Sequence, residues 1–343
     1  MNILSSVFCG DSEFSVAVAA AQKNPPIMIT GVCSNAYAPF CCGVLEKSGE
    51  KLLISVPEEK DAYRISQQMT KLGANVLVWP ARDCVLDNIR TVSRDWEQQR
   101  LNVLRRILDG EYDAIISVPD ALMQYTVPSD VMIDSTVSLS HHTGCDLEAL
   151  CRKLVSLGYS SGQQVEGKGQ FSMRGGILDV FSPNYDNPIR IDFFGDEIET
   201  LTFFDVLDQR SFEKCGSVDI VPATELIIND QAKERIAAAA DSLASKTSDA
   251  KLRTQLMSDA ENAKENVRFA SLDKYFSCIY PKHESLFDYL PSVLRVVIDV
   301  KRVADRAKAY SWELSQTVAH ACSSGAAAYE NADLSMNDTV LLA

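Results

Sequence analysis

The chain has 343 residues, 46% of them hydrophobic, which is ordinary for a globular protein and enough for two or three domains with their own cores. Its formal net charge of -14 makes the surface repel phosphate backbones, so broad non-specific nucleic-acid binding is not expected. The start, MNILSSVFCG, lacks the regions of a signal peptide and no apolar run is long enough to cross a bilayer, so we expect no membrane association, a cytoplasmic location and ten reduced cysteines.

The first 130 residues alternate helical patterns with short apolar runs, which is typical of a parallel α/β sheet. In chain order we expect helix 13–23, an apolar run at 27–30 as the first strand, helix 35–47, strand 51–56, helix 58–72, strand 75–79, helix 93–109 and strand 113–118. Ligands of such sheets bind at the carboxyl ends of the strands. The turn after residue 30 is therefore the first place to look for a site.

That turn, TGVCSNAYA, has the position of a nucleotide-binding P-loop but lacks its chemistry. On the spacing G-x-x-x-x-G-K-[ST], Gly31 is kept, while Ala36, Tyr37 and Ala38 replace the second glycine, the lysine and the hydroxyl residue. Tyr37 supplies no cation for phosphate and Ala38 no ligand for magnesium. One matching glycine does not separate a degenerate P-loop from an ordinary strand–helix turn.

Residues 131–223 have a different texture, with helix 147–157 followed by short strands and glycine turns that indicate an antiparallel or mixed sheet. Residues 194–197 read as a hairpin turn with Gly195 and Asp196 at its centre. Alternation places some side chains inward and others outward. The inward set is Ile189, Ile191, Phe193, Phe171 and Met173, and the outward set is Arg190, Asp192, Phe194, Gln170, Ser172 and Arg174.

After Pro222 the chain is helical again over 230–266, and strand 294–299 then leads into helix 301–316. Asp299 ends that strand where an ATPase places its Walker B aspartate, but Val300 stands in place of the glutamate that activates water. Both halves of the nucleotide site lack their reactive groups. We therefore predict no ATP hydrolysis and no catalytic residue in this chain.

No metal site is expected either. The sequence has no C-x-x-C pair, and His141, His142 and Cys145 lack a second ligand pair at zinc spacing.

Two stretches carry a family resemblance: VEGKGQFSMRGGILDVFSP at 165–183 and IRIDFFGDEIETLTFFDVLDQRS at 189–211. They resemble the bacterial transcription-repair coupling factors (Mfd) and, more distantly, the excinuclease subunit UvrB. Residues 80–92 contain no tyrosine and little room for the DNA-inserting hairpin of UvrB, which favours the coupling factors. The resemblance implies an N-terminal UvrB-homology fragment of a longer protein.

The implied fold is a UvrB-like, degenerate P-loop, helicase-type α/β domain that an inserted strand-rich α+β domain splits in sequence. Residues 1–130 form its first half, 131–223 the inserted domain, and 224–343 a helical and α/β second half that is truncated at the C-terminus.

The resemblance also implies a partner, UvrA, bound through Arg174, Arg190 and Phe194. The two arginines would contact acidic groups and Phe194 would be the apolar anchor. From the pattern alone, Arg190 would instead pair with Asp192 or Asp179, and Phe194 would pack beneath a helix such as 147–157.

RNA polymerase, double-stranded DNA, ATP and magnesium would belong to domains beyond residue 343, so no cofactor is expected here. The chain would be a recruitment module that brings nucleotide excision repair to stalled RNA polymerase. The alternatives are a UvrB-like ATPase and a structural brace for the motor.

Overall fold

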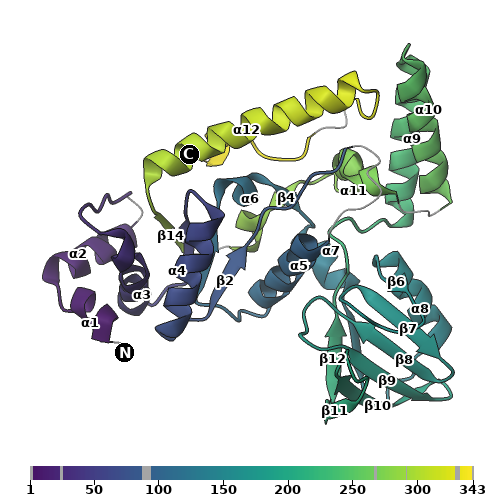
Figure 1. Ribbon diagram of the computed structural model, residues 1–343, viewed down its shortest axis with the longest axis horizontal. Coiled ribbons are helices and arrows are strands. Elements are labelled where there is room, and N and C mark those ends of the chain that lie inside the picture. Colours follow the sequence, from purple (N-terminus) through teal and green to yellow (C-terminus); the bar gives the residue numbers. More distant parts are fainter. Residues whose placement is uncertain are drawn as a thin grey trace.

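The computed structural model describes residues 3–23, 26–86, 94–265, 269–290, 292–328 and 333–341. Figure 1 shows two parts, an α/β part and a strand-rich module below it at the right of the view. The predicted α/β class with a strand-rich insert is confirmed. Residues 80–92, which the sequence leaves without a tyrosine-rich hairpin, are described only as far as residue 86.

The α/β part is built on a four-stranded parallel sheet in the order β14, β1, β3, β2. The two central strands, β1 and β3, are buried on both faces in the manner of parallel sheets, whereas the edge strands β14 and β2 are partly open to solvent. The four strands lie within a residue or two of the expected positions, at Leu294–Val297 (β14), Leu52–Ser55 (β1), Ala114–Ser117 (β3) and Val76–Trp79 (β2).

Helices alternate with these strands in the first half, as expected. Asp11 caps the start of α2, because its side chain accepts hydrogen bonds from the backbone N–H groups of Glu13 and Phe14. The helices are α1 (Ile3–Cys9), α2 (Ser12–Ala21), α3 (Tyr37–Ser48), α4 (Glu59–Lys71), α5 (Asp95–Leu108), α6 (Pro119–Met123) and α7 (Ser129–Ser135).

The expected first strand at 27–30 is wrong. This run has no regular structure, and it leads through the 3-10 turn η1 (Ser34–Ala36) into α3. Ile27 and Ile29 lie beside β14 across a cavity, and Met28 is exposed to solvent. Apolar, β-prone residues form a strand only when a neighbouring strand accepts their ladder, and the described residues supply none to this run.

The strand-rich module, residues 137–220, contains a six-stranded sheet in the order β11, β10, β9, β8, β7, β6. Its pairs are antiparallel except for the parallel pair of β6 with β7, so the predicted antiparallel or mixed sheet is confirmed. The strands are β6 (Ser160–Ser161), β7 (Gln170–Arg174), β8 (Ile177–Phe181), β9 (Ile189–Phe194), β10 (Glu197–Phe204) and β11 (Ser211–Lys214).

Tight glycine turns set the register of this sheet. Gly195 takes a φ of 62° in the two-residue turn between β9 and β10, as the hairpin motif predicts. Gly175 takes a φ of 60° between β7 and β8, and a Cβ on Gly176 would lie 3.0 Å from the carbonyl oxygen of Phe193. The backbone therefore approaches itself so closely there that a side chain at residue 176 would force its neighbour to shift.

One face of the sheet is covered by α8 (Leu147–Ser156), whose Leu150 and Leu154 pack with Ile189 and Ile191 in the core of the module. The chain enters the module through β5 (Val137–Ser140) and leaves through β12 (Ser217–Ile220), and these two strands pair antiparallel. The entry and exit points are thus neighbours.

The remaining segments complete the α/β part. Where a single helical run was expected at 230–266, the chain forms a hairpin of two helices, because Asp249 caps a second helix with its side chain. The elements are β4 (Tyr125–Thr126), α9 (Asp230–Lys246), α10 (Ala250–Lys264), η2 (Ala270–Tyr275), α11 (Phe276–Ile279), β13 (Glu284–Ser285), η3 (Leu286–Tyr289), α12 (Val300–Ser323) and α13 (Asp338–Leu341).

Most buried apolar residues belong to one large core around the parallel sheet, and a second core fills the module. Met132 on α7 packs in the large core, while Val137 and Leu139 on β5 pack in the second. All ten cysteines are free thiols. Among the described residues, no helix is both long and apolar enough to span a bilayer.

Candidate functional site

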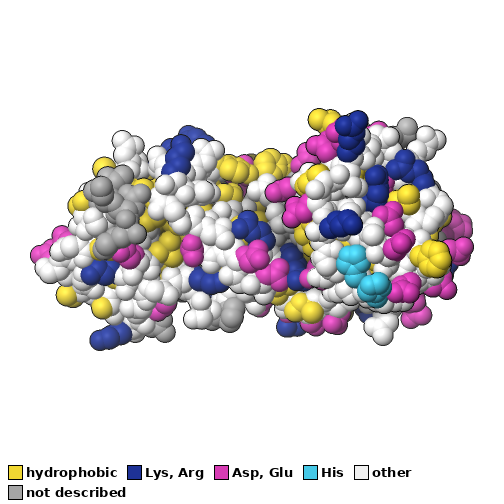
Figure 2. Space-filling view, turned by 90° about the horizontal axis from the view of Figure 1, so that it is seen from below, with side chains coloured by type: hydrophobic (Ala, Val, Ile, Leu, Met, Phe, Trp, Pro, Cys, Tyr) yellow, Lys and Arg dark blue, Asp and Glu magenta, His cyan; other side chains and the backbone are white. Residues whose placement is uncertain are grey.

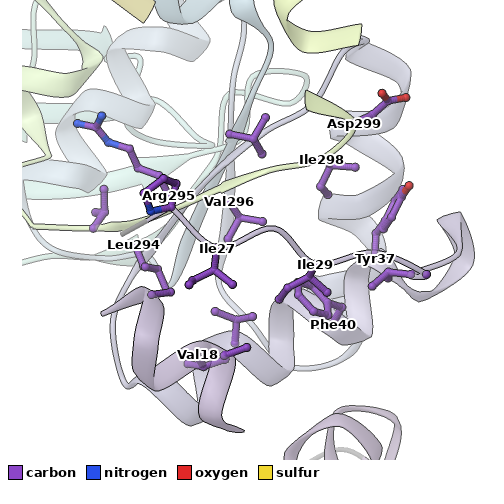
Figure 3. A pocket seen from close by; sticks show the side chains of 18 residues that line it. Val18, Ile27, Ile29, Tyr37, Phe40, Leu294, Arg295, Val296, Ile298 and Asp299 are labelled. Carbon is purple, nitrogen blue, oxygen red and sulfur yellow. The ribbon is translucent and has the colours of Figure 1, made fainter. Parts of the chain in front are cut away.

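The structure brings three of the predicted nucleotide-site residues together. Gly31, Tyr37 and Asp299 line one cavity of about 840 Å³ between the 26–32 segment, α2, α3 and β14 (Figure 3). Gly31 takes a φ of 86°, a conformation that suits glycine, at the position the P-loop spacing assigns to it. Ala36, Ala38 and Val300 are not among the described lining residues.

The groups in this cavity do not fit a magnesium nucleotide. Asp299 has a φ of 60° and its carboxylate caps α12, accepting from the backbone N–H of Arg302 at 3.4 Å, with the Arg302 guanidinium 3.7 Å away. Ala38, on α3, is fully buried. Val300 is the first residue of α12, and its side chain is exposed. The described lining offers no serine or threonine hydroxyl, and its cation, Arg295, lies over the ring of Phe287.

Most of the side chains that line this cavity are instead apolar. Figure 3 shows aliphatic and aromatic side chains gathered between the helices and the sheet edge, with Asp299 at the rim. The apolar wall consists of Val18, Ile27, Ile29, Phe40, Val44, Leu294, Val296 and Ile298.

The second candidate site is the outer face of the module, defined as the sheet surface that carries Arg174, Asp179, Arg190 and Phe194. Strand register places Asp179 on β8 directly opposite Arg190 on β9. The carboxylate of Asp179 is fully buried and accepts from Nε and Nη2 of Arg190 at 2.8 and 2.9 Å. It also accepts from Nη2 of Arg174 at 2.8 Å. Two arginines thus share one buried carboxylate.

Because they share Asp179, the two arginines differ in how many N–H donors they can still offer to a partner. Arg190 donates a third hydrogen bond, from Nη1 to the carbonyl oxygen of Gln209 at 3.1 Å, and its side chain is 18% exposed. A guanidinium has five N–H groups, so Arg190 keeps two for a partner. Arg174 is 52% exposed and keeps four. The two arginines and the Asp179 carboxylate together carry one net positive charge. Hydrogen bonding to Asp179 raises the pKa of Arg190 above its ordinary value.

Phe194, at the end of β9, is 79% exposed. The expected packing beneath a helix is therefore wrong, whereas the expected pairing of Arg190 with Asp179 is found. Asp192 does not pair with Arg190 and instead accepts a hydrogen bond from the hydroxyl of Thr200. Arg174, Arg190 and Phe194 thus lie on one sheet face, as alternation predicts.

Two residues depart from the predicted alternation. Met173, expected inside, is 48% exposed at the margin of α8, with its Sδ 3.8 Å from Sγ of Cys151. Ser172, expected outside, is buried under the loop at Gln163, to whose carbonyl oxygen its hydroxyl donates at 2.8 Å. Alternation identifies the face of a side chain but not the loops that cover that face.

The sequence does not identify Gln209, whose backbone carbonyl accepts a hydrogen bond from Arg190. Any residue type can supply a backbone carbonyl, so the contact does not depend on the side chain at position 209. Sequence reasoning also did not find Ile177, which is partly exposed beside Arg174 in the register of β7 and β8. Ile177 could have been found from the sequence, because the hairpin pairs it with Arg174, which the alternation pattern had already placed on the outer face.

Helix α5 holds the module against the α/β part. Arg100 on α5 is fully buried, donates to both carboxylate oxygens of Glu225 at 2.5 and 3.1 Å, and stacks over Trp79. Glu225 lies on the segment that leaves the module. Arg105, one turn further along α5, donates to Asp219 on β12 at 2.8 Å. These contacts fix the orientation in which the outer face is presented.

Charge is dispersed rather than concentrated on the molecule's underside. Figure 2 shows basic and acidic side chains intermixed there, with lysines and arginines in small separate groups. His142 lies near the hairpin tip, where its Nδ1 is 2.9 Å from Oε1 of Glu197. The described residues contain no group of three or more metal-ligating side chains suited to an ion.

The sequence of this chain matches a family model and several curated proteins. Residues 137–226 match the family model of the UvrB interaction domain. The transcription-repair-coupling factor of Bacillus subtilis is 27% identical over 79% of the chain, that of Myxococcus xanthus 30% over 80%, and that of Staphylococcus epidermidis 25% over 89%. The chain covers 24%, 23% and 27% of these proteins, so it spans about a quarter of their length. The chain is therefore related to the transcription-repair-coupling factors over most of its length and contains a UvrB interaction domain.

Proposed function

We propose that this chain is a non-catalytic recruitment module that binds UvrA through the outer face of its strand-rich module. The observation that carries the proposal is the exposed Phe194 beside two arginines that a buried Asp179 holds in place. Aromatic residues and arginines are the side chains that most often dominate binding energy at protein interfaces.

The geometry supports this role because the site is preorganised. Arg190 has three hydrogen bonds that fix its guanidinium before any partner arrives, so little side-chain freedom is lost on binding. Arg174 is the freer donor and suits a two-point contact with an acidic group. Phe194 supplies apolar area at the end of the same strand.

The rest of the chain supports a role without ATP hydrolysis. The cavity that contains Gly31, Tyr37 and Asp299 is lined mostly by apolar side chains, and its aspartate is engaged as a helix cap. In this proposal ATP, magnesium, RNA polymerase and double-stranded DNA are bound by parts of a longer protein beyond residue 343. The module links repair to transcription that has stalled at a DNA lesion.

Calorimetric titration of the chain into purified UvrA tests the proposal. The informative variant is Arg174→Ala/Phe194→Ala, because both side chains are exposed and their loss spares the Arg190–Asp179 contact. A matched control is Arg152→Ala/Val155→Ala on α8, which removes one exposed arginine and one exposed apolar side chain from the opposite side of the sheet.

We expect the parent chain and the control to bind UvrA, and the Arg174→Ala/Phe194→Ala variant to bind at least tenfold more weakly. Equal binding by all three proteins would place the contact elsewhere. No binding by the parent chain would favour the structural-brace alternative and refute the proposal.

A further inference from the structure

The turn between β10 and β11, residues 205–210, presents an apolar side chain to solvent. Leu207 at its tip is 93% exposed, the largest exposed fraction of any described large hydrophobic residue. A single exposed leucine needs no explanation on a flexible loop. This turn, however, is tightly built and touches the proposed site.

Backbone and side-chain hydrogen bonds both close the turn. The backbone N–H of Asp205 donates to the carbonyl of Arg210 at 3.0 Å, and that of Gln209 donates to the carbonyl of Asp205 at 2.8 Å. The Asp205 carboxylate accepts from the backbone N–H of Leu207 at 2.7 Å. The backbone that carries Leu207 is therefore held in place before any partner arrives, which lowers the entropy cost of a contact with the turn.

The turn is joined to the proposed site through Arg190. Nη1 of Arg190 donates to the carbonyl of Gln209, two residues from Leu207, while the same guanidinium binds Asp179 and lies 4.5 Å from the ring of Phe204. Arg190 thus fixes the turn and the sheet face to each other as one surface.

The distance between two of the proposed anchors, Phe194 and Arg190, is too short to span an interface. Phe194 and Arg190 lie four residues apart on β9, so they span about 13 Å. A standard interface buries about 800 Å² on each partner, a patch roughly 30 Å across. Phe194 stands at one end of β9, and the turn that carries Leu207 contacts Arg190 toward the other end.

We propose that the UvrA-binding surface continues from Phe194 past Arg190 to the 205–210 turn, with Leu207 as a second apolar anchor. This inference rests on the proposed function. It predicts that the matching surface of UvrA has an acidic group in its middle, facing the arginines, and an apolar site at each end, facing Phe194 and Leu207.

Titration of the full chain into purified UvrA tests it with Leu207→Ala, Phe194→Ala and the double variant. Val155→Ala on α8 is the matched control, since it truncates an exposed apolar side chain away from the outer face. Thermal unfolding checks that the exposed substitutions leave the fold intact. We expect Leu207→Ala to weaken binding about tenfold, and Val155→Ala to leave it unchanged.

The double variant distinguishes a direct contact of Leu207 with UvrA from an indirect effect of Leu207→Ala on the Phe194 contact. Anchors at opposite ends of one surface contribute independently, so the fold-losses of Leu207→Ala and Phe194→Ala should multiply. Normal binding by Leu207→Ala beside a weakened Phe194→Ala variant would overturn this inference and leave the proposed function standing. If the parent chain itself fails to bind, the proposed function and this extension fall together.

Discussion

Replacing Arg190 should damage the module itself as well as its binding. In Arg190→Ala the buried carboxylate of Asp179 loses two of its three arginine hydrogen bonds and keeps only the one from Arg174. A hydrogen bond to a charged group contributes about 1.5–3 kcal/mol, and removing one partner of a buried ion pair costs about 3–5 kcal/mol. Because Arg174 remains and Arg190 is 18% exposed, we expect a loss of about 3 kcal/mol, at the low end of that range.

The sequence offers a convenient assay for this loss. All three tryptophans, Trp79, Trp96 and Trp312, lie outside residues 137–220. Their fluorescence reports the α/β part, whereas amide hydrogen exchange on β8 and β9 reports the module. In urea, Arg190→Ala should unfold the module earlier while the tryptophan transition shifts less.

Arg174→Ala is the control, because its side chain is half exposed and makes one bond to Asp179. Its stability loss should be below about 1 kcal/mol. If Arg190→Ala also loses less than about 1 kcal/mol, water or a rearranged side chain compensates Asp179 and the buried-pair reasoning is wrong. In that case weakened UvrA binding by Arg190→Ala would report a direct contact alone.

Three further predictions follow from other parts of the chain. Glu225→Gln should lower the free energy of unfolding by about 3 kcal/mol in chemical denaturation, because Arg100 is left buried without a carboxylate; an unchanged midpoint would contradict this. Iodoacetamide at pH 8 should modify the exposed Cys33 well before Cys41, as burial raises the pKa of the Cys41 thiol to about 12 and leaves almost no thiolate; equal labelling by mass spectrometry would refute the packing of α3. With ATP and magnesium the chain should release no phosphate above a blank, since Tyr37 supplies no cation to the cavity, and sustained turnover in a phosphate assay would disprove the degenerate site.

Periodicity predicted much of the fold because it depends on local sequence. The alternation in IRIDFF correctly placed Ile189 and Ile191 in the core and Arg190 on the other face. The four parallel strands were found for the same reason. Their order in the sheet was not predicted, because β14 pairs with β1 although the whole inserted module lies between them in sequence.

The failures occur where a distant segment decides the outcome. The run at 27–30 has the residues of a strand but no ladder partner among the described residues. The alternation along β7 places Ser172 on the outward face of the sheet, but the loop at Gln163 covers it. The candidate site shows the same division. The sequence pattern placed Arg190 and Phe194 on one face, but the pairing of Arg190 with Asp179 follows from the strand register, and the 79% exposure of Phe194 is seen only in the folded structure.

The pairing of residue 52 with residue 294 also orders events during synthesis. The module's antiparallel strands pair with close neighbours in sequence, and such local contacts form quickly. The parallel sheet cannot receive its edge strand until the ribosome has passed β14, and domains generally fold as units while the chain emerges. A nascent chain therefore finishes the surface that carries Phe194 while its own larger core is still open.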